Sequence, residues 1–172
     1  MFDYSDCKCV FLSRDKIWEK ADSFRKRYWP NGILPIDMEH IIEKGLCLNI
    51  IPEHDIKRLL KIDAYLLSDL KGIVVDISQY MDDLNRYEKR LRFTFAHEVG
   101  HLVLHKYIFK KFDFISPKEY LIFMDNFPED QYSNFEYQAN EFGGRLLVPR
   151  ENLVIELNHS YEIIKCISHE LC

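Results

Sequence analysis

The sequence has no long run of apolar residues. None approaches the roughly 20 residues that a bilayer-spanning helix needs, so we expect no membrane-spanning segment and no membrane partner. The first residues, Met1 to Asp6, are acidic and lack the charged-then-apolar order of a signal peptide. We therefore expect a cytoplasmic protein.

An excess of basic residues is also missing. Lys and Arg number 23 against 28 Asp and Glu, which gives a formal net charge of −5. A nucleic-acid-binding surface needs a basic footprint. We therefore expect no direct binding to nucleic acid.

Cysteine is scarce and odd in number, with five residues scattered along the chain. Such a set in a chain without an export signal favours reduced thiols. Two groupings, Cys7-Lys8-Cys9 and Cys166-x-x-His169-x-x-Cys172, lack the spacing of standard zinc fingers. We expect neither grouping to form a second metal site.

The chain does contain enough apolar residues for one core. Of its 172 residues, 47% are hydrophobic and 14% are aromatic, which is typical of a single domain of this length. We expect one domain over 1–172, with its core at about 35–150. An N-terminal helical segment (1–30) precedes that core, and a C-terminal helical extension (151–172) follows it.

Local patterns indicate helices first and then short strands. The periodicity predicts an amphipathic helix over Asp15–Tyr28. A second helix begins near Pro35 and ends at Gly45. Three short apolar runs follow, at residues 47–51, 64–67 and 72–77. The last two, separated by a polar turn, indicate a small antiparallel sheet.

The most informative stretch is His97-Glu98-Val99-Gly100-His101, on a helix that we expect to begin with a capping box at Asn85–Glu88. Residues four apart share one helix face, so His97 and His101 can direct two imidazoles at one point. Glu98 lies at the edge of that face, where it can act on a water molecule without being a ligand. This is the arrangement that zinc-assisted hydrolysis requires. The alternative is a solvated helix with this spacing by accident.

The rest of this helix predicts a cleft. One face is apolar, formed by Leu91, Phe95, Val99 and Leu102. The opposite face carries Thr94, His97, His101 and His105. Apolar neighbours flank the histidine face, which is typical of a cleft lining rather than of an exposed surface. A glycine within a helix, such as Gly100, lowers helix stability by about 1 kcal/mol relative to Ala. We expect it to be needed here because another backbone passes close to it.

A zinc site usually has three protein ligands and a water molecule, so a third ligand is needed. Glu136, on a predicted helix over Phe135–Pro149, can supply it. Asn140, one turn later, can accept a hydrogen bond from the far ring nitrogen of a ligating histidine. Small residues on this helix, at 139, 143 and 144, would let the two helices approach closely.

Two alternatives compete with this choice of ligand. Ser133–Glu136 is itself a capping-box pattern, which would engage Glu136 locally unless the helix begins earlier, near Pro128 or Asp130. His105 lies two turns from His97, about 12 Å along the axis. It cannot easily reach the same ion, although it can line the cleft.

Residues 106–133 form a long, aromatic connection between the two motifs. We expect an edge strand or a wall of the cleft at Tyr120–Met124, able to hold an extended peptide. The alternative is that its rings simply cover the core. Candidates to line the cleft and stabilise an oxyanion are His105, Tyr137 and Arg145, and the sequence does not rank them.

The two motifs together resemble the ImmA/IrrE-type metallopeptidases. The resemblance rests on the run from Arg92 to His105, on Glu136-x-x-Ala139-Asn140-x-Phe142, and on Leu146–Pro149. It implies an α+β fold, a compact zincin-like (gluzincin-type) domain with helices around a short antiparallel or mixed sheet. It also implies Zn²⁺ held by His97, His101 and Glu136, with Glu98 as the catalytic glutamate. The chain departs from the family in having glycine at positions 143 and 144, where we expect alanines.

The resemblance further implies a substrate. Several members of that family are thought to cleave helix-turn-helix repressors in mobile elements or stress responses. No helix-turn-helix segment is apparent here, so the repressor would be a separate chain. Our leading hypothesis is a zinc endopeptidase. One alternative is a non-catalytic protein that sequesters the repressor around a structural zinc, and another is a hydrolase acting on a non-peptide bond.

Overall fold

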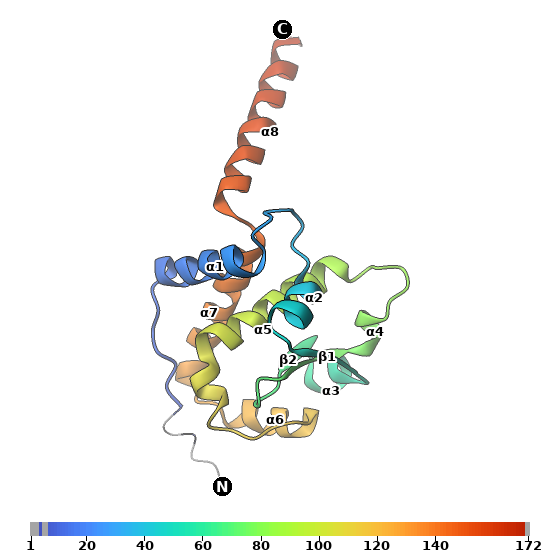
Figure 1. The fold of residues 1–172 in the computed structure, drawn as a ribbon, viewed down its shortest axis with the longest axis vertical. Helices are drawn as coiled ribbons and strands as arrows, with labels where there is room; N and C mark the ends of the chain where they lie inside the picture. Colours follow the sequence, from blue (N-terminus) through green and yellow to red (C-terminus); the bar gives the residue numbers. More distant parts are fainter. Residues whose placement is uncertain (1–3, 5–6, 171–172) are drawn as a thin grey trace.

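The computed structural model describes residue 4 and residues 7–170, except the side chains of 166–170. The proposed grouping of Cys166, His169 and Cys172 therefore lies outside the described side chains. Within the described part, eight α-helices, one π-helical turn and three strands follow one another (Figure 1). The elements are α1 (Arg14–Tyr28), α2 (Met38–His40), η1 (Ile41–Gly45), β1 (Asn49–Glu53), α3 (Ile56–Leu60), β2 (Ala64–Leu66), β3 (Gly72–Asp76), α4 (Ile77–Tyr80), α5 (Glu88–Phe109), α6 (Pro117–Asn126), α7 (Glu129–Leu147) and α8 (Arg150–Glu170).

The three strands form one mixed sheet in the order β1-β3-β2. The antiparallel pairing of β2 with β3, with Tyr65 opposite Val74, confirms the prediction for the last two apolar runs. The first run pairs in parallel with β3, with Ile51 opposite Val74. Every residue of β2 and β3 is buried. The molecule is therefore an α+β protein whose small sheet has β1 and β2 at its two edges.

Helix α5 lies at the centre of the fold. It packs most extensively against α7, which also packs against α1. Helix α5 contacts the sheet through β2 (Figure 1). The predicted apolar face of α5 is buried at Leu91, Phe95 and Val99 and partly buried at Leu102. Because α5 is covered on both sides, the histidine face is also enclosed: His101 and His105 are 4% and 0% exposed.

Gly100 lies at the closest approach of α5 and α7. A Cβ atom added there would stand 3.0 Å from the carbonyl oxygen of Ala139 and 3.1 Å from its Cα. Gly143 on α7 meets the backbone of α5 in the same way, 3.2 Å from the His97 nitrogen. Gly144 has open space around it, so only Gly143 of the two glycines belongs to the contact. The predicted passage of a backbone beside Gly100 is confirmed.

This contact predicts opposite effects for two glycine substitutions. Gly100→Ala should lower the free energy of unfolding by about 1–2 kcal/mol, because the backbone of Ala139 cannot move aside without separating two packed helices. Gly144→Ala, the matched control, should raise it by about 0.5–1 kcal/mol through helix propensity alone. Urea denaturation followed by circular dichroism measures both values. Equal shifts for the two variants would contradict the close packing.

Two predictions for local structure are wrong. Helix α5 begins at Glu88 without a side-chain cap, because Asn85 adopts a left-handed backbone conformation with φ of 52°. Glu88 instead forms an ion pair with Arg92. The segment Tyr120–Met124 is not an edge strand but part of helix α6, which a capping box between Ser116 and Glu119 begins. The other form of that prediction, a wall of the cleft, is confirmed, because Tyr120, Leu121 and Met124 line the pocket described below.

The long aromatic connection is mostly helical. Helix α5 continues to Phe109, α6 follows, and α7 starts at Glu129 after Pro128. Most of the aromatic side chains here pack on one another, namely those of Phe109, Phe112, Phe114, Phe123, Phe127 and Phe135. The alternative reading, that these rings cover the core, is confirmed for this set. No helix among the described residues is long and apolar enough to cross a membrane.

Candidate metal centre

Three side chains from two helices meet at one point. His97 and His101 lie one turn apart on α5, and Glu136 faces them from α7. The Nε2 atoms of the two histidines are 3.0 Å apart. Glu136 places Oε2 at 3.4 Å from Nε2 of His97 and Oε1 at 3.5 Å from Nε2 of His101. Among the described residues, this cluster of His and Glu is able to hold a metal ion.

The spacing of the three donors suits a small divalent cation. Tetrahedral zinc bonds of about 2.0–2.1 Å place neighbouring ligand atoms roughly 3.3–3.4 Å apart. The separations of 3.0, 3.4 and 3.5 Å found here bracket that value. Two imidazoles and one carboxylate are also a donor set that zinc accepts, with a fourth position left for water or substrate. The residues present therefore fit the ion.

Helix α7 starts early enough to free Glu136 for this role. Its first residue is Glu129, so Ser133 to Glu136 lie within the helix rather than at its cap. The competing capping-box interpretation of Glu136 is therefore wrong. Asn140, one turn beyond Glu136, accepts a hydrogen bond at Oδ1 from Nδ1 of His97 at 3.0 Å. That bond holds the proton on Nδ1 and leaves the Nε2 lone pair directed at the site.

His101 is oriented by a buried chain of hydrogen bonds. Its Nδ1 lies 3.0 Å from Nδ1 of His105, whose Nε2 lies 3.2 Å from Oε1 of Gln138. The amide of Gln138 is fixed because its Nε2 donates to the carbonyl of Val10 and to Asn134 Oδ1. Since Oε1 of Gln138 can only accept, His105 donates from Nε2 and accepts at Nδ1. His101 then carries its proton on Nδ1 and presents the Nε2 lone pair to the site.

The surroundings of the cluster shift the pKa values of its side chains. Burial lowers the pKa of His101 to about 4 and that of His105 to about 3, so both rings are neutral at pH 7. Burial opposes ionisation of Glu136, but hydrogen bonds with His101 and His97 outweigh it and lower its pKa. Burial also acts to lower the pKa of His97, but its hydrogen bond with Glu136 and the charges of Glu98 and Glu136 outweigh it and raise that pKa. A neutral His101 and an ionised Glu136 are the protonation states that a metal ligand needs, and a cation would compete with a proton at His97.

Glu98 stands beside the cluster without joining it. It is 6% exposed, and its Oε2 accepts a hydrogen bond of 2.9 Å from the backbone nitrogen of Leu66. Leu66 belongs to β2, and this N–H points away from β3, to the free edge of the sheet. Burial raises the pKa of Glu98 to about 7. A carboxyl group with that pKa can accept a proton and release it again near neutral pH.

An open pocket of about 560 Å³ reaches the cluster. Its wall includes His97, Glu98, His101 and Glu136. The remaining lining comes from the end of α3 with the start of β2, from the solvent side of α5, from α6 and from Tyr132 on α7. The sheet edge and α6 therefore form two sides of a cleft, with the cluster between them.

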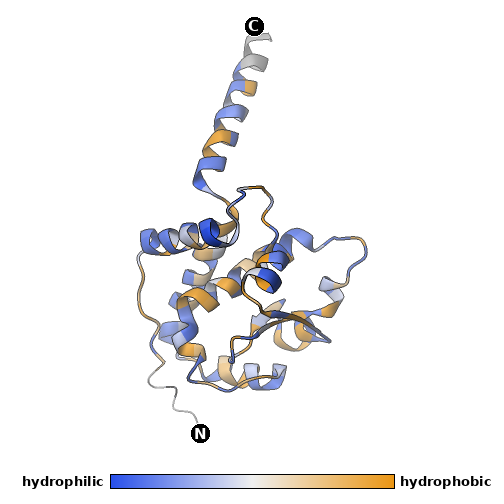
Figure 2. Cartoon of the chain, viewed as in Figure 1, coloured by the Kyte–Doolittle hydropathy of each residue, from blue (hydrophilic) through white to orange (hydrophobic). Residues whose placement is uncertain are grey.

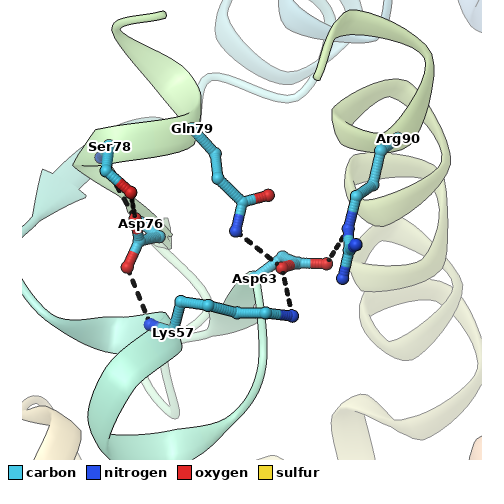
Figure 3. Close-up of polar contacts among 6 residues, drawn as sticks. All are labelled: Lys57, Asp63, Asp76, Ser78, Gln79 and Arg90. Carbon is cyan, nitrogen blue, oxygen red and sulfur yellow. Dashed lines mark hydrogen bonds and ion pairs between the residues drawn. The ribbon is translucent and has the colours of Figure 1, made fainter. Parts of the chain in front are cut away.

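A partly buried carboxylate, that of Asp63, fixes one rim of this pocket (Figure 3). Asp63, just before β2, accepts hydrogen bonds from Lys57 Nζ at 2.7 Å, Gln79 Nε2 at 2.8 Å and Arg90 Nε at 2.6 Å. These donors come from α3, α4 and α5. Burial acts to raise the pKa of Asp63, but these donors outweigh it and lower the pKa. The start of β2 is thereby tied to α5, which keeps Leu66 within reach of Glu98.

The chain was compared with models of known protein families. A family model described as the IrrE N-terminal-like domain, Peptidase_M78, matches residues 84–171, just over half of the chain. The chain belongs to this family. The match contains α5 and α7, and thus every residue of the cluster. No curated protein and no solved structure matches the chain.

Three residues that we expected to line the cleft of this Peptidase_M78 member lie elsewhere. His105 is fully buried behind His101. Arg145 points to the far side of α7, where it forms an ion pair with Asp22 of α1 at 2.6 Å. Tyr137 is 44% exposed and does not contribute to the pocket. The reason is rotation about α7: both residues project away from the side that carries Glu136.

Two tyrosines line the pocket: Tyr120 belongs to the segment expected as a wall of the cleft, whereas Tyr132 was not singled out from the sequence. Tyr132 lies one turn before Glu136 on α7, and Tyr120 comes from α6. Burial raises the pKa of each phenol, with a further contribution from the charge of Glu136. Their hydroxyls therefore remain protonated donors. The i, i+4 spacing of Tyr132 and Glu136 was a usable sequence signal, since it places both on one helix face.

Proposed function

We propose that the chain is a zinc-dependent endopeptidase with a zincin-like fold of the gluzincin type. The observation that carries this proposal is the convergence of His97, His101 and Glu136 at a pocket that Glu98 also lines. Membership of the Peptidase_M78 family supports the reaction class. The two histidines and Glu136 would hold the ion, which when bound would acidify a water molecule and polarise the scissile carbonyl.

The chain's own residues account for the proton transfers. Glu98, held by the Leu66 N–H, takes a proton from the attacking water and later passes it to the leaving amine. Tyr132, 39% exposed at the pocket wall, is placed to donate a hydrogen bond to the oxygen that gains negative charge. Asn140 and the His105–Gln138 pair keep the two imidazoles in the tautomers that bind a cation.

The substrate that we propose is a helix-turn-helix repressor encoded near this gene, acting in the same cytoplasm. Support comes from the family and from the pocket, whose open shape suits a peptide segment rather than an enclosed small molecule. Cleavage of such a repressor would relieve repression. The chain's net charge of −5 is consistent with a protein target rather than with DNA.

The experiment is to incubate the purified chain with that neighbouring repressor and to identify fragments by mass spectrometry. We expect fragments in the presence of zinc, none after removal of zinc by a chelator, and their return when zinc is added back. A zinc-loaded chain that forms a stable complex with intact repressor would contradict cleavage and support sequestration. No binding and no fragments would exclude this substrate.

A further inference from the structure

Helix α8 carries apolar side chains that the fold does not use. It projects from the rest of the molecule (Figure 1), and all side chains from residue 151 to 165 are exposed. Figure 2 shows apolar residues interspersed with polar ones along it. Among the described side chains of α8, the large apolar ones that are exposed are Leu153, Val154, Ile155, Leu157, Tyr161, Ile163 and Ile164. A monomeric protein rarely leaves so many of them together in water.

Most of these side chains lie on one stripe. At about 100° per residue, Leu153, Val154, Leu157, Tyr161 and Ile164 fall within an arc of roughly 100°. The last four are separated by three, four and three residues, the spacing of the two seam positions in a coiled coil. Ile155 and Ile163 project outside this stripe. The stripe is therefore shaped to receive another helix.

The charges beside the stripe indicate which helix it receives. Glu151, Asn158 and Lys165 follow one another every seven residues along one flank. The charge is thus negative at the start of this flank and positive at its end. Lys165 also has an interaction within its own chain. Its positive charge remains on this flank whether or not that interaction is kept in a pair of helices. A second α8 running in the opposite direction would bring each Glu151 to the Lys165 of the other copy.

We propose that α8 pairs with α8 of a second copy of this chain in antiparallel orientation. In that pairing, Val154 lies opposite Ile164 of the other copy, and Leu157 lies opposite Tyr161. Two Glu151–Lys165 ion pairs flank the seam. Parallel pairing buries the same stripe, but it sets Glu151 and Lys165 at opposite ends and forms no ion pair between them.

The body of the protein extends this interface. A groove of about 570 Å³ lies at the base of α8, lined by Trp18, Asn140, Glu141, Gly144, Arg145, Val148, Arg150 and Leu153. Leu153 belongs to both the groove and the stripe, so the two surfaces are continuous. In the antiparallel pair the two bodies lie at opposite ends of the helix pair.

The test is the molar mass of the full chain in solution, measured by light scattering after size exclusion at about 100 µM, because an interface of this modest size forms a weak dimer. We expect twice the chain mass of 20.7 kDa. Leu157→Glu should give the monomer mass. Ile155→Glu, the matched control on the other face, with 63% exposure against 60% for Leu157, should remain dimeric. A monomeric wild-type chain, or equal effects of the two variants, would overturn the proposal.

Charge exchange tests the orientation. Glu151→Lys and Lys165→Glu should each raise the dissociation constant about tenfold, since each turns two attractive pairs into repulsive ones. The double variant should restore it. Single variants without effect, or a double variant weaker than either, would overturn the antiparallel pairing. None of these substitutions touches the metal cluster, so unchanged metal content and circular dichroism in all variants show that each remains folded.

Discussion

Replacing Glu98 by Gln should lower kcat for peptide cleavage by about 10³-fold while the metal stays bound. The amide preserves the shape of the side chain and can keep a contact with the Leu66 N–H, but it cannot accept a proton from water. His97, His101 and Glu136 are untouched, so the affinity for metal should change little. Single-turnover cleavage measures the loss of rate, and elemental analysis measures the bound metal.

The pH dependence gives this prediction a second readout. Burial raises the pKa of Glu98 to about 7, and a cation at the neighbouring ligands acts in the opposite direction. Only the ionised form is a base, so activity should fall as the pH decreases through this pKa. The residual activity of Glu98→Gln should lack that acid limb. A Glu98→Gln variant with wild-type kcat, or one that loses its metal, would contradict the assignment of Glu98 as the base.

Replacing Glu136 by Ala should weaken zinc binding by at least about 100-fold. Loss of a residue that only hydrogen-bonds to a ligand typically weakens metal binding by about 10- to 100-fold, and loss of a ligand itself should cost more. Two neutral imidazoles would remain at 3.0 Å from one another, without the carboxylate that completes the donor set and offsets the charge of the ion. Competition with a chromophoric chelator measures the affinity. Cleavage should disappear with the metal.

Glu129→Ala is the matched control for this substitution. Glu129 is an exposed carboxylate at the first residue of the same helix, two turns before Glu136, and it is not one of the residues that line the pocket. Its removal should leave both zinc affinity and cleavage unchanged. Undiminished metal in Glu136→Ala, or equal losses in the two variants, would show that Glu136 is not a ligand.

The sequence predicted the parts of this site that depend on helical spacing. His97 and His101 are one turn apart, and so are Glu136 and Asn140, so each pair was assigned to one face before the fold was known. Gly100 was assigned to a close helix contact for the same reason, since its cost within a helix required an explanation. These inferences need only the geometry of a single element.

Contacts between distant segments were beyond that reasoning. The bond from Leu66 to Glu98 joins residues 32 apart, and Gln138 meets Val10 across 128 residues. No short-range sequence pattern indicates that the residues of either pair are in contact. His105 was assigned to the cleft because it shares a face with His101, but the N-terminal segment and α7 cover that part of the face.

Two errors came from reading one local signal without its neighbours. Tyr120–Met124 resembled a strand by its aromatic and aliphatic content, yet Ser116, Pro117 and Glu119 just before it carry a complete start signal for a helix. Asn85–Glu88 resembled such a start, but the turn before α5 places Asn85 in a left-handed conformation that cannot cap it. Capping patterns are reliable only when the backbone at the cap is extended.

The most direct test of the central claim is a crystal of the zinc-loaded protein with data collected on both sides of the zinc absorption edge. The account predicts one anomalous peak within about 2.0–2.2 Å of Nε2 of His97, Nε2 of His101 and a carboxylate oxygen of Glu136. A peak bound elsewhere, or no peak at these three side chains in zinc-saturated crystals, would contradict it.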